Sequence, residues 1–167
     1  MNSPAYSMAD NGVDLAGRGD INSDCAYGTR YLTLLDGLSN SVSFAVLFPT
    51  NGPTPPLRHI HEPLEHALPF LHRANNDGAD IFVVVNETNL EGAKDADVVR
   101  IRAVFADDDQ KRETYRIDWP LEPHLIIESS PGRYHYYWLV DGLAVAEFKL
   151  VHQAIAKQYG TDPSITN

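Results

Sequence analysis

The 167-residue chain is 43% hydrophobic and 22% charged, as is typical of globular domains, and its formal net charge is −10. It has no apolar run near the roughly 20 residues that span a bilayer, no signal-peptide pattern, and one cysteine, which excludes an internal disulfide. We therefore expect a cytoplasmic protein without membrane association. The acidic balance argues against a broad nucleic-acid-binding surface, although a local basic patch can be assembled from Arg73, Arg100, Arg102, Arg116 and Arg133.

Residues 1–25 are rich in Ser, Asn, Asp, Gly and Ala and lack apolar periodicity, so we expect a disordered arm followed by one domain over residues 26–167. The spacing of apolar residues predicts the elements of that domain. In chain order these are a helix at 27–38, a strand at 41–48, a helix at 61–76, a strand buried on both faces at 79–85, strands at 99–109, 124–128 and 133–140, and a helix at 143–159. Helices and strands mix without strict alternation, which indicates an α+β fold with a mainly antiparallel central sheet and flanking helices.

The predicted strand at 99–109 ends in three consecutive carboxylates, Asp107, Asp108 and Asp109. Side chains alternate along a strand, so Asp107 and Asp109 share one face and Asp108 points to the other. Two carboxylates on one face suit a hard divalent cation, and magnesium keeps waters that a substrate phosphate can replace. The alternative is a solvated acidic turn, because blocks of like charge usually lie in water.

A second candidate site is the segment SSPGRYH at residues 129–135. We expect a turn at residues 129–132, followed by a strand in which Arg133 and His135 share one face. Turn hydroxyls and N–H groups can donate to phosphate oxygens, and the arginine adds a permanent positive charge, so the segment suits a polyphosphate. The alternative is a hairpin with aromatic packing.

Four separated segments, NNDGADIFVVVNETN, VRIRAVFADDD, ESSPGRYHYYW and YGTDPSIT, together resemble the RepB-like primase domains of plasmids and bacteriophages, members of the archaeo-eukaryotic primase superfamily. This resemblance implies a catalytic core related to the RNA-recognition fold, with a small accompanying α/β unit. It also implies a C-terminally truncated fragment, because a basic, glycine-containing segment commonly follows in relatives.

The resemblance assigns metal ligands. Asp107 and Asp109 match the family's Asp-x-Asp pair, and Asp162 is the best match for its third acidic ligand. The implied cofactor is Mg²⁺ or Mn²⁺.

The resemblance also assigns a nucleotide site. His135 matches the histidine of a Ser-x-His element that contacts the incoming triphosphate. Arg133 stands where the serine is expected, so Ser129 and Ser130 are carried over in its place.

The implied function is that of a DNA primase or primase-polymerase, with Asp107, Asp109, Asp162 and His135 as the catalytic residues. The implied partners are a single-stranded DNA template, nucleoside triphosphates and a replicative helicase. Two other functions fit the same residues: a non-catalytic replication-initiation module that binds DNA or a helicase, and a metal-dependent nuclease.

Overall fold

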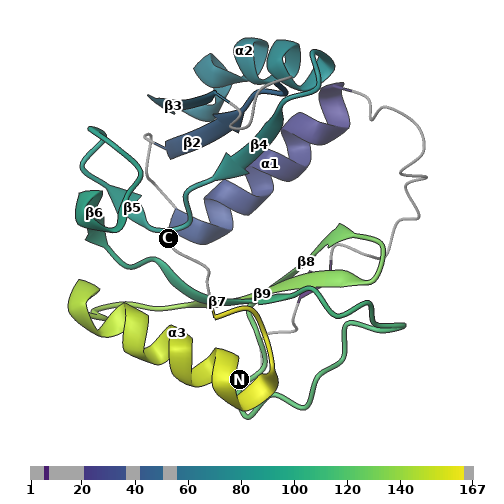
Figure 1. The fold of residues 1–167 in the computed structure, drawn as a ribbon, viewed down its shortest axis with the longest axis vertical. Coiled ribbons are helices and arrows are strands. Elements are labelled where there is room, and N and C mark those ends of the chain that lie inside the picture. The colour runs from purple at the N-terminus through teal and green to yellow at the C-terminus, as the bar shows by residue number, and fades with distance from the viewer. Residues whose placement is uncertain (1–5, 8–20, 37–41, 51–55, 164–167) are drawn as a thin grey trace. The chain divides into compact units, whose positions relative to one another are not determined.

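The computed structural model describes residues 6–7, 21–36, 42–50 and 56–163. The chain divides into two compact units, an N-terminal unit over residues 15–100 and a C-terminal unit over residues 101–166 together with residues 1–14. Each unit has its own sheet and its own hydrophobic core (Figure 1). Mixed helices and mainly antiparallel strands confirm the predicted fold class.

The N-terminal unit contains a three-stranded antiparallel sheet in the order β3-β2-β4. Alternating residues of β2 point into the core, where they pack against the apolar stripe of α2. A separate two-stranded sheet joins β5 to β6. The elements of this unit are α1 (Ile21–Asp36), β2 (Val42–Leu47), β3 (Leu57–Glu62), α2 (Leu64–Asn76), β4 (Asp80–Val83), β5 (Glu87–Thr88) and β6 (Val98–Arg100).

The C-terminal unit is built on a sheet in the order β1-β8-β9-β7. The pair β1–β8 is parallel, whereas β8–β9 and β9–β7 are antiparallel. Figure 1 shows α3 running along this sheet. The elements are β1 (Tyr6–Ser7), β7 (Ala103–Asp108), β8 (Leu125–Ser130), β9 (Arg133–Leu139) and α3 (Val145–Tyr159).

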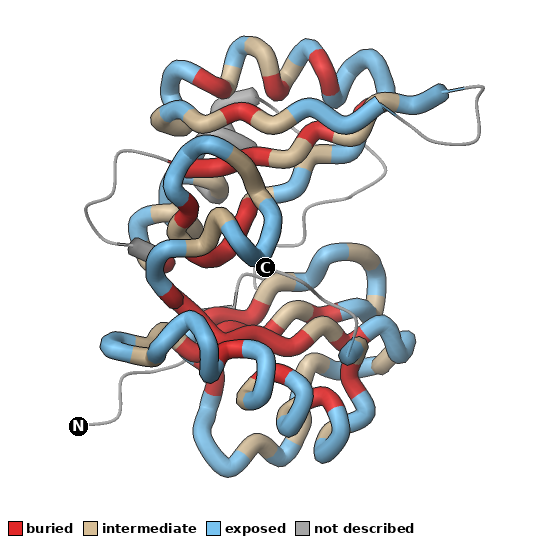
Figure 2. The backbone as a smooth tube through the Cα atoms, turned by 60° about the vertical axis from the view of Figure 1, so that its left-hand side comes forward, coloured by how far each residue is buried: buried red, intermediate tan, exposed pale blue. Residues whose placement is uncertain are grey.

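One face of this sheet forms an aromatic core. Its buried members are Ala106, Ile126, Tyr134, Tyr136 and Trp138, against which Tyr115, Ile117, Trp119 and Ile155 pack. Figure 2 shows the buried residues concentrated along the strands. The tyrosines and tryptophan of β9 on this face are therefore core residues rather than a base-stacking platform.

Three predicted elements differ from the structure. The run at 99–109 is two strands, because β6 pairs with β5 in one unit and β7 with β9 in the other. The predicted helix at 61–76 begins only at Leu64, because Glu62 precedes a proline, which favours extended backbone, and ends β3. The strand predicted to be buried on both faces, β4, has an exposed face, with Phe82 53% exposed. Apolar content does not reveal whether the second face of a strand is covered.

Part of the predicted disordered arm carries structure. β1 lies within residues 1–25, and α1 begins at Ile21. The other residues of the arm lie outside the described part of the chain. Among the residues that the structure describes, no helix is long and apolar enough to cross a membrane.

Candidate active site

The first predicted aspartate and the predicted histidine face each other across two neighbouring strands. Asp107 of β7 is paired in register with His135 of β9, and residues paired in this way share one face of a sheet. The Nε2 atom of His135 lies 3.2 Å from Oδ1 of Asp107. The structure thus brings together two residues that are 28 positions apart in the sequence.

Asp109 lies just beyond the end of β7, where it meets the first residue of β9. Its Oδ1 atom is 3.6 Å from Nε of Arg133. The two side chains are 61% and 45% exposed, so the pair contributes little to stability and both groups are accessible to a ligand. Asp109 and Arg133 thus form a second charged pair, which is more exposed than the pair of Asp107 and His135.

Asp162 approaches the end of β7 from the segment that follows α3. α3 ends at Gly160, whose left-handed backbone (φ 70°) turns the chain back. The N–H of Asp162 then donates to the carbonyl oxygen of Asp107 at 2.9 Å. The backbone of the third predicted ligand therefore lies beside the backbone of the first.

The serines occupy a β-hairpin. The pairing of β8 with β9 shifts between Glu128 and Ser130, which makes Ser129 the extra residue of a bulge. Ser130 pairs with Arg133 and therefore shares its face of the sheet. Both serines belong to β8, so the predicted four-residue turn is shorter than expected.

One N–H group of this turn already has a protein acceptor. The N–H of Gly132 donates to Oε1 of Glu128 at 2.9 Å. Burial and the negative charge of the same carboxylate raise the pKa of Tyr134. The turn itself is therefore a weaker phosphate-binding element than the sequence suggests, and Arg133 and Ser130 are the better candidates.

Asp108 has a different environment from its two neighbours. It is fully buried and faces away from Asp107, opposite Tyr134. Its carboxylate pairs with Nε of Arg112 and accepts the N–H of Gln110 at 3.1 Å. The interpretation as a solvated acidic turn is therefore wrong for Asp108. Asp108 does point away from the predicted metal ligand Asp107.

The segment from Asp108 to Arg112 connects the three parts of the site. The N–H of Arg112 donates to the carbonyl oxygen of Gly132 at 2.9 Å, at the hairpin turn. The side-chain amide of Gln110 donates to the carbonyl oxygen of Gly160 at 2.9 Å, two residues before Asp162. This role has no signal in the sequence, because the segment has no apolar periodicity and Gly132 and Gly160 are distant from it in the chain.

A buried polar atom shows that Asp107 fits a cation. Its Oδ1 atom is shielded from solvent and makes no hydrogen bond within the described residues, and its short contact with His135 is electrostatic. A carboxylate oxygen in this state has free acceptor capacity for a divalent ion. Across residues 6–7, 21–36, 42–50 and 56–163, however, no three His, Cys, Asp or Glu side chains already converge as a metal site. The ligand set of Asp107, Asp109 and Asp162 remains a prediction.

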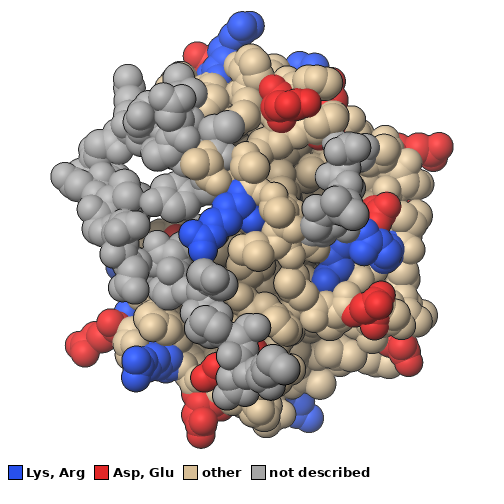
Figure 3. Space-filling view, turned by 180° about the vertical axis from the view of Figure 1, so that it is seen from behind, with Lys and Arg blue, Asp and Glu red and all other residues tan. Residues whose placement is uncertain are grey.

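Within the C-terminal unit the predicted basic residues are not grouped, because Arg102 is buried and Arg116 lines a pocket that does not include Arg133. In the N-terminal unit, Arg100 pairs with Glu87 at 2.6 Å. On the face drawn in Figure 3, Lys and Arg atoms form separate groups among acidic and uncharged atoms.

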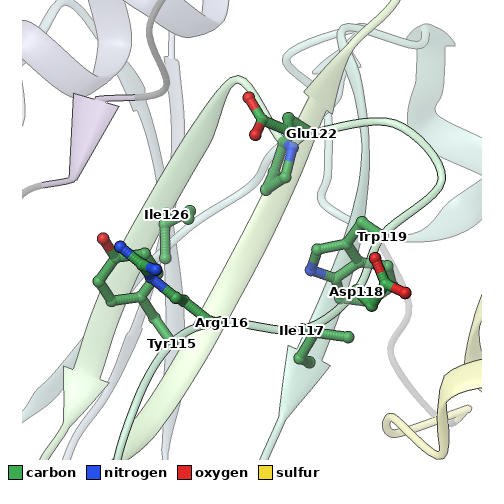
Figure 4. Close-up of a pocket in the computed structure, with 8 residues that line it drawn as sticks. Tyr115, Arg116, Ile117, Asp118, Trp119, Glu122 and Ile126 are labelled. Carbon is green, nitrogen blue, oxygen red and sulfur yellow. The ribbon is translucent and has the colours of Figure 1, made fainter.

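A pocket of about 560 Å³ lies on the aromatic face of the C-terminal sheet. Figure 4 shows Arg116 and Ile126 on one side of it and Trp119 and Asp118 on the other, with Glu122 above them. Its charged side chains are mixed in sign, and none of the predicted site residues lines it. The predicted site lies on the opposite face, where the side chains of His135 and Asp107 are 33% and 22% exposed.

Residues 86–167 match the family model of the RepB DNA-primase N-terminal domain. The predicted resemblance to RepB-like primases is confirmed. This RepB-like segment contains the whole C-terminal sheet except β1, and all the predicted site residues. No curated protein sequence matches the chain.

Two solved structures share the fold of this chain. The AEP domain of the cyanophage S-2L primase-polymerase is 18% identical with a TM-score of 0.64, covering 81% of this chain and 73% of that one. The primase RepB′ is 22% identical with a TM-score of 0.58, covering 84% of this chain and 45% of that one. At these identities the likeness establishes the fold.

Proposed function

We propose that this chain is the catalytic domain of a DNA primase or primase-polymerase that performs template-directed nucleotidyl transfer in plasmid or phage replication. The observation that carries the proposal is that two charged pairs, Asp107 with His135 and Asp109 with Arg133, lie at one end of β7. The backbone N–H of Asp162 donates to the carbonyl oxygen of Asp107 at the same end. The match to the RepB primase family and the primase-type fold support it.

In this proposal Asp107, Asp109 and Asp162 hold Mg²⁺ or Mn²⁺. A bound divalent cation lowers the pKa of an attacking hydroxyl and stabilises the charge of a triphosphate and its leaving group. The buried Oδ1 atom of Asp107, which has no hydrogen bond among the described residues, supports its place in this set.

Arg133 and His135 bind the triphosphate. Arg133 carries a permanent charge with forked donors, and its exposure leaves it accessible to a phosphate. Ser130 lies opposite Arg133 on the same face, where its hydroxyl can add a further donor. The template is single-stranded DNA, and a replicative helicase is the proposed protein partner.

The test is primer synthesis by the full chain on a single-stranded template with labelled nucleotides and manganese. Asp107→Asn and Asp109→Asn should each lower synthesis by more than roughly 100-fold, since even groups outside a metal's first coordination shell typically contribute 10- to 100-fold. Asp118→Asn is the matched control, because it removes the same charge from an exposed carboxylate at the pocket on the other face.

Three results would contradict the proposal. Unchanged primer synthesis by both Asp107→Asn and Asp109→Asn would show that the two aspartates have no catalytic role. Degradation of the template by the wild-type chain indicates a nuclease. DNA binding without synthesis or degradation indicates a non-catalytic replication module.

A further inference from the structure

The imidazole of His135 is held between two groups on the same face of the C-terminal sheet. Its Nε2 atom lies 3.2 Å from Oδ1 of Asp107, and its Nδ1 atom lies 3.3 Å from the hydroxyl oxygen of Tyr137. Tyr137 follows two residues later on β9 and is 95% buried. Its ring packs against Phe105, which precedes Asp107 by two residues on β7.

These contacts define which nitrogen carries the proton. The 3.2 Å contact does not have hydrogen-bond geometry, but a lone pair on Nε2 at that distance would be repelled by an ionised carboxylate. The nitrogen that faces Asp107 is therefore the N–H. In a neutral imidazole the other nitrogen is then an acceptor, and the hydroxyl of Tyr137 is the donor placed to reach it. The ring therefore presents an Nε2–H group at the site, not a lone pair.

We propose that Tyr137 is a positioning residue that holds His135 in the Nε2–H tautomer, with that N–H directed at the site. This inference rests on the proposed function, in which the donor meets a triphosphate oxygen beside Asp107. Tyr137 acts through His135 and does not itself touch the nucleotide. The burial of its ring against Phe105 keeps the hydroxyl in place, since few rotamers remain to it.

The first test needs no activity. The full chain is labelled with ¹⁵N, and the imidazole nitrogens are observed about two pH units above the ordinary histidine pKa of ~6.5. The signals of His135 are assigned from their loss in His135→Gln. The wild-type ring should show a protonated Nε2 and an unprotonated Nδ1, and a proton on Nδ1 would overturn the proposal.

The second test removes only the hydroxyl. In Tyr137→Phe the two tautomers of His135 should become mixed, because the hydroxyl that selects one of them is absent. Tyr136→Phe is the matched control: it removes a neighbouring buried hydroxyl that donates to the carbonyl oxygen of Tyr115 on the other face. The ¹⁵N signals of His135 in Tyr136→Phe should match those of the wild type. Unchanged tautomer populations in Tyr137→Phe would overturn the proposal.

Kinetics separates positioning from general packing. In primer synthesis, Tyr137→Phe should raise KM for the nucleoside triphosphate roughly 3- to 10-fold, the usual contribution of one neutral hydrogen bond, with a smaller change in kcat. Tyr136→Phe should leave KM unchanged. If the chain makes no primers but the tautomer responds as expected, the proposed function fails while the role of Tyr137 in orienting His135 stands.

Discussion

Three consecutive aspartates occupy three environments. Asp107 is partly buried beside His135, Asp108 is fully buried against Arg112, and Asp109 is exposed beside Arg133. Strand alternation separates Asp108 from the other two, and the end of β7 frees Asp109. Asp108 is therefore unsuitable as a neutral control for its neighbours, because changing it disturbs a buried ion pair.

At the residue scale, Arg112→Ala should destabilise the C-terminal unit more than Asp108→Asn. Removing the arginine leaves an uncompensated charge on a side chain with no exposure, which we expect to cost about 3 kcal/mol. Asn keeps the acceptor for Gln110 and frees the arginine, already 29% exposed, to turn to water. Urea denaturation of both variants measures the difference, and equal midpoints would contradict this reading of the pair.

At the element scale, the β8–β9 hairpin and the segment after β7 depend on each other. Gly132 has φ +77°, and a Cβ atom placed there would lie 2.8 Å from the carbonyl oxygen of Arg112. The backbone of Arg112 is itself hydrogen-bonded to Gly132, so neither chain can move away without breaking that bond. The hairpin thus sets the position of Arg133 relative to Asp109.

Gly132→Ala should therefore lower stability by about 2 kcal/mol or more and weaken nucleotide binding. Gly142→Ala is the matched control, because Gly142 has a similar φ of +74° but nothing within 4 Å of its Cβ position. We expect only the backbone cost there, about 1 kcal/mol. Thermal unfolding and nucleotide titration of the two variants test this, and an equal loss in both would show that the Arg112 contact is unimportant.

At the scale of the whole molecule, stability should depend on pH through His152. This side chain is 2% exposed, stacks on Phe148, and packs against Phe105. Burial lowers the pKa of His152 below its ordinary value of 6.5, and the charge of Asp162 opposes that shift only in part.

The unfolded chain therefore binds a proton at His152 at a higher pH than the folded chain does. The contribution of this group is complete above pH 6.5 and is lost as the pH falls toward the folded pKa, at no more than about 1.4 kcal/mol per pH unit. Urea denaturation at several pH values should show a shallower acid dependence for His152→Phe than for the wild type. Parallel curves for the two proteins would exclude the effect.

Three features could be predicted from the sequence: the class of fold, most of the strands of the C-terminal sheet, and the alternation that sets Asp107 and Asp108 on opposite faces. These features depend on local periodicity, which is present in the residues themselves. The sequence also indicated the primase family, because four separated segments each carry part of its pattern.

The pairing of the strands and the contacts of each polar group are known only from the tertiary structure. Local periodicity does not identify the contact partners of a residue, whether they are near to it or far from it in the chain. The division of residues 99–109 into two sheets, the burial of Asp108 against Arg112, and the approach of Asp162 to Asp107 all depend on such partners. The donor role inferred for Tyr137 depends on the register of β9 against β7, because that register places Asp107 at the other nitrogen of His135.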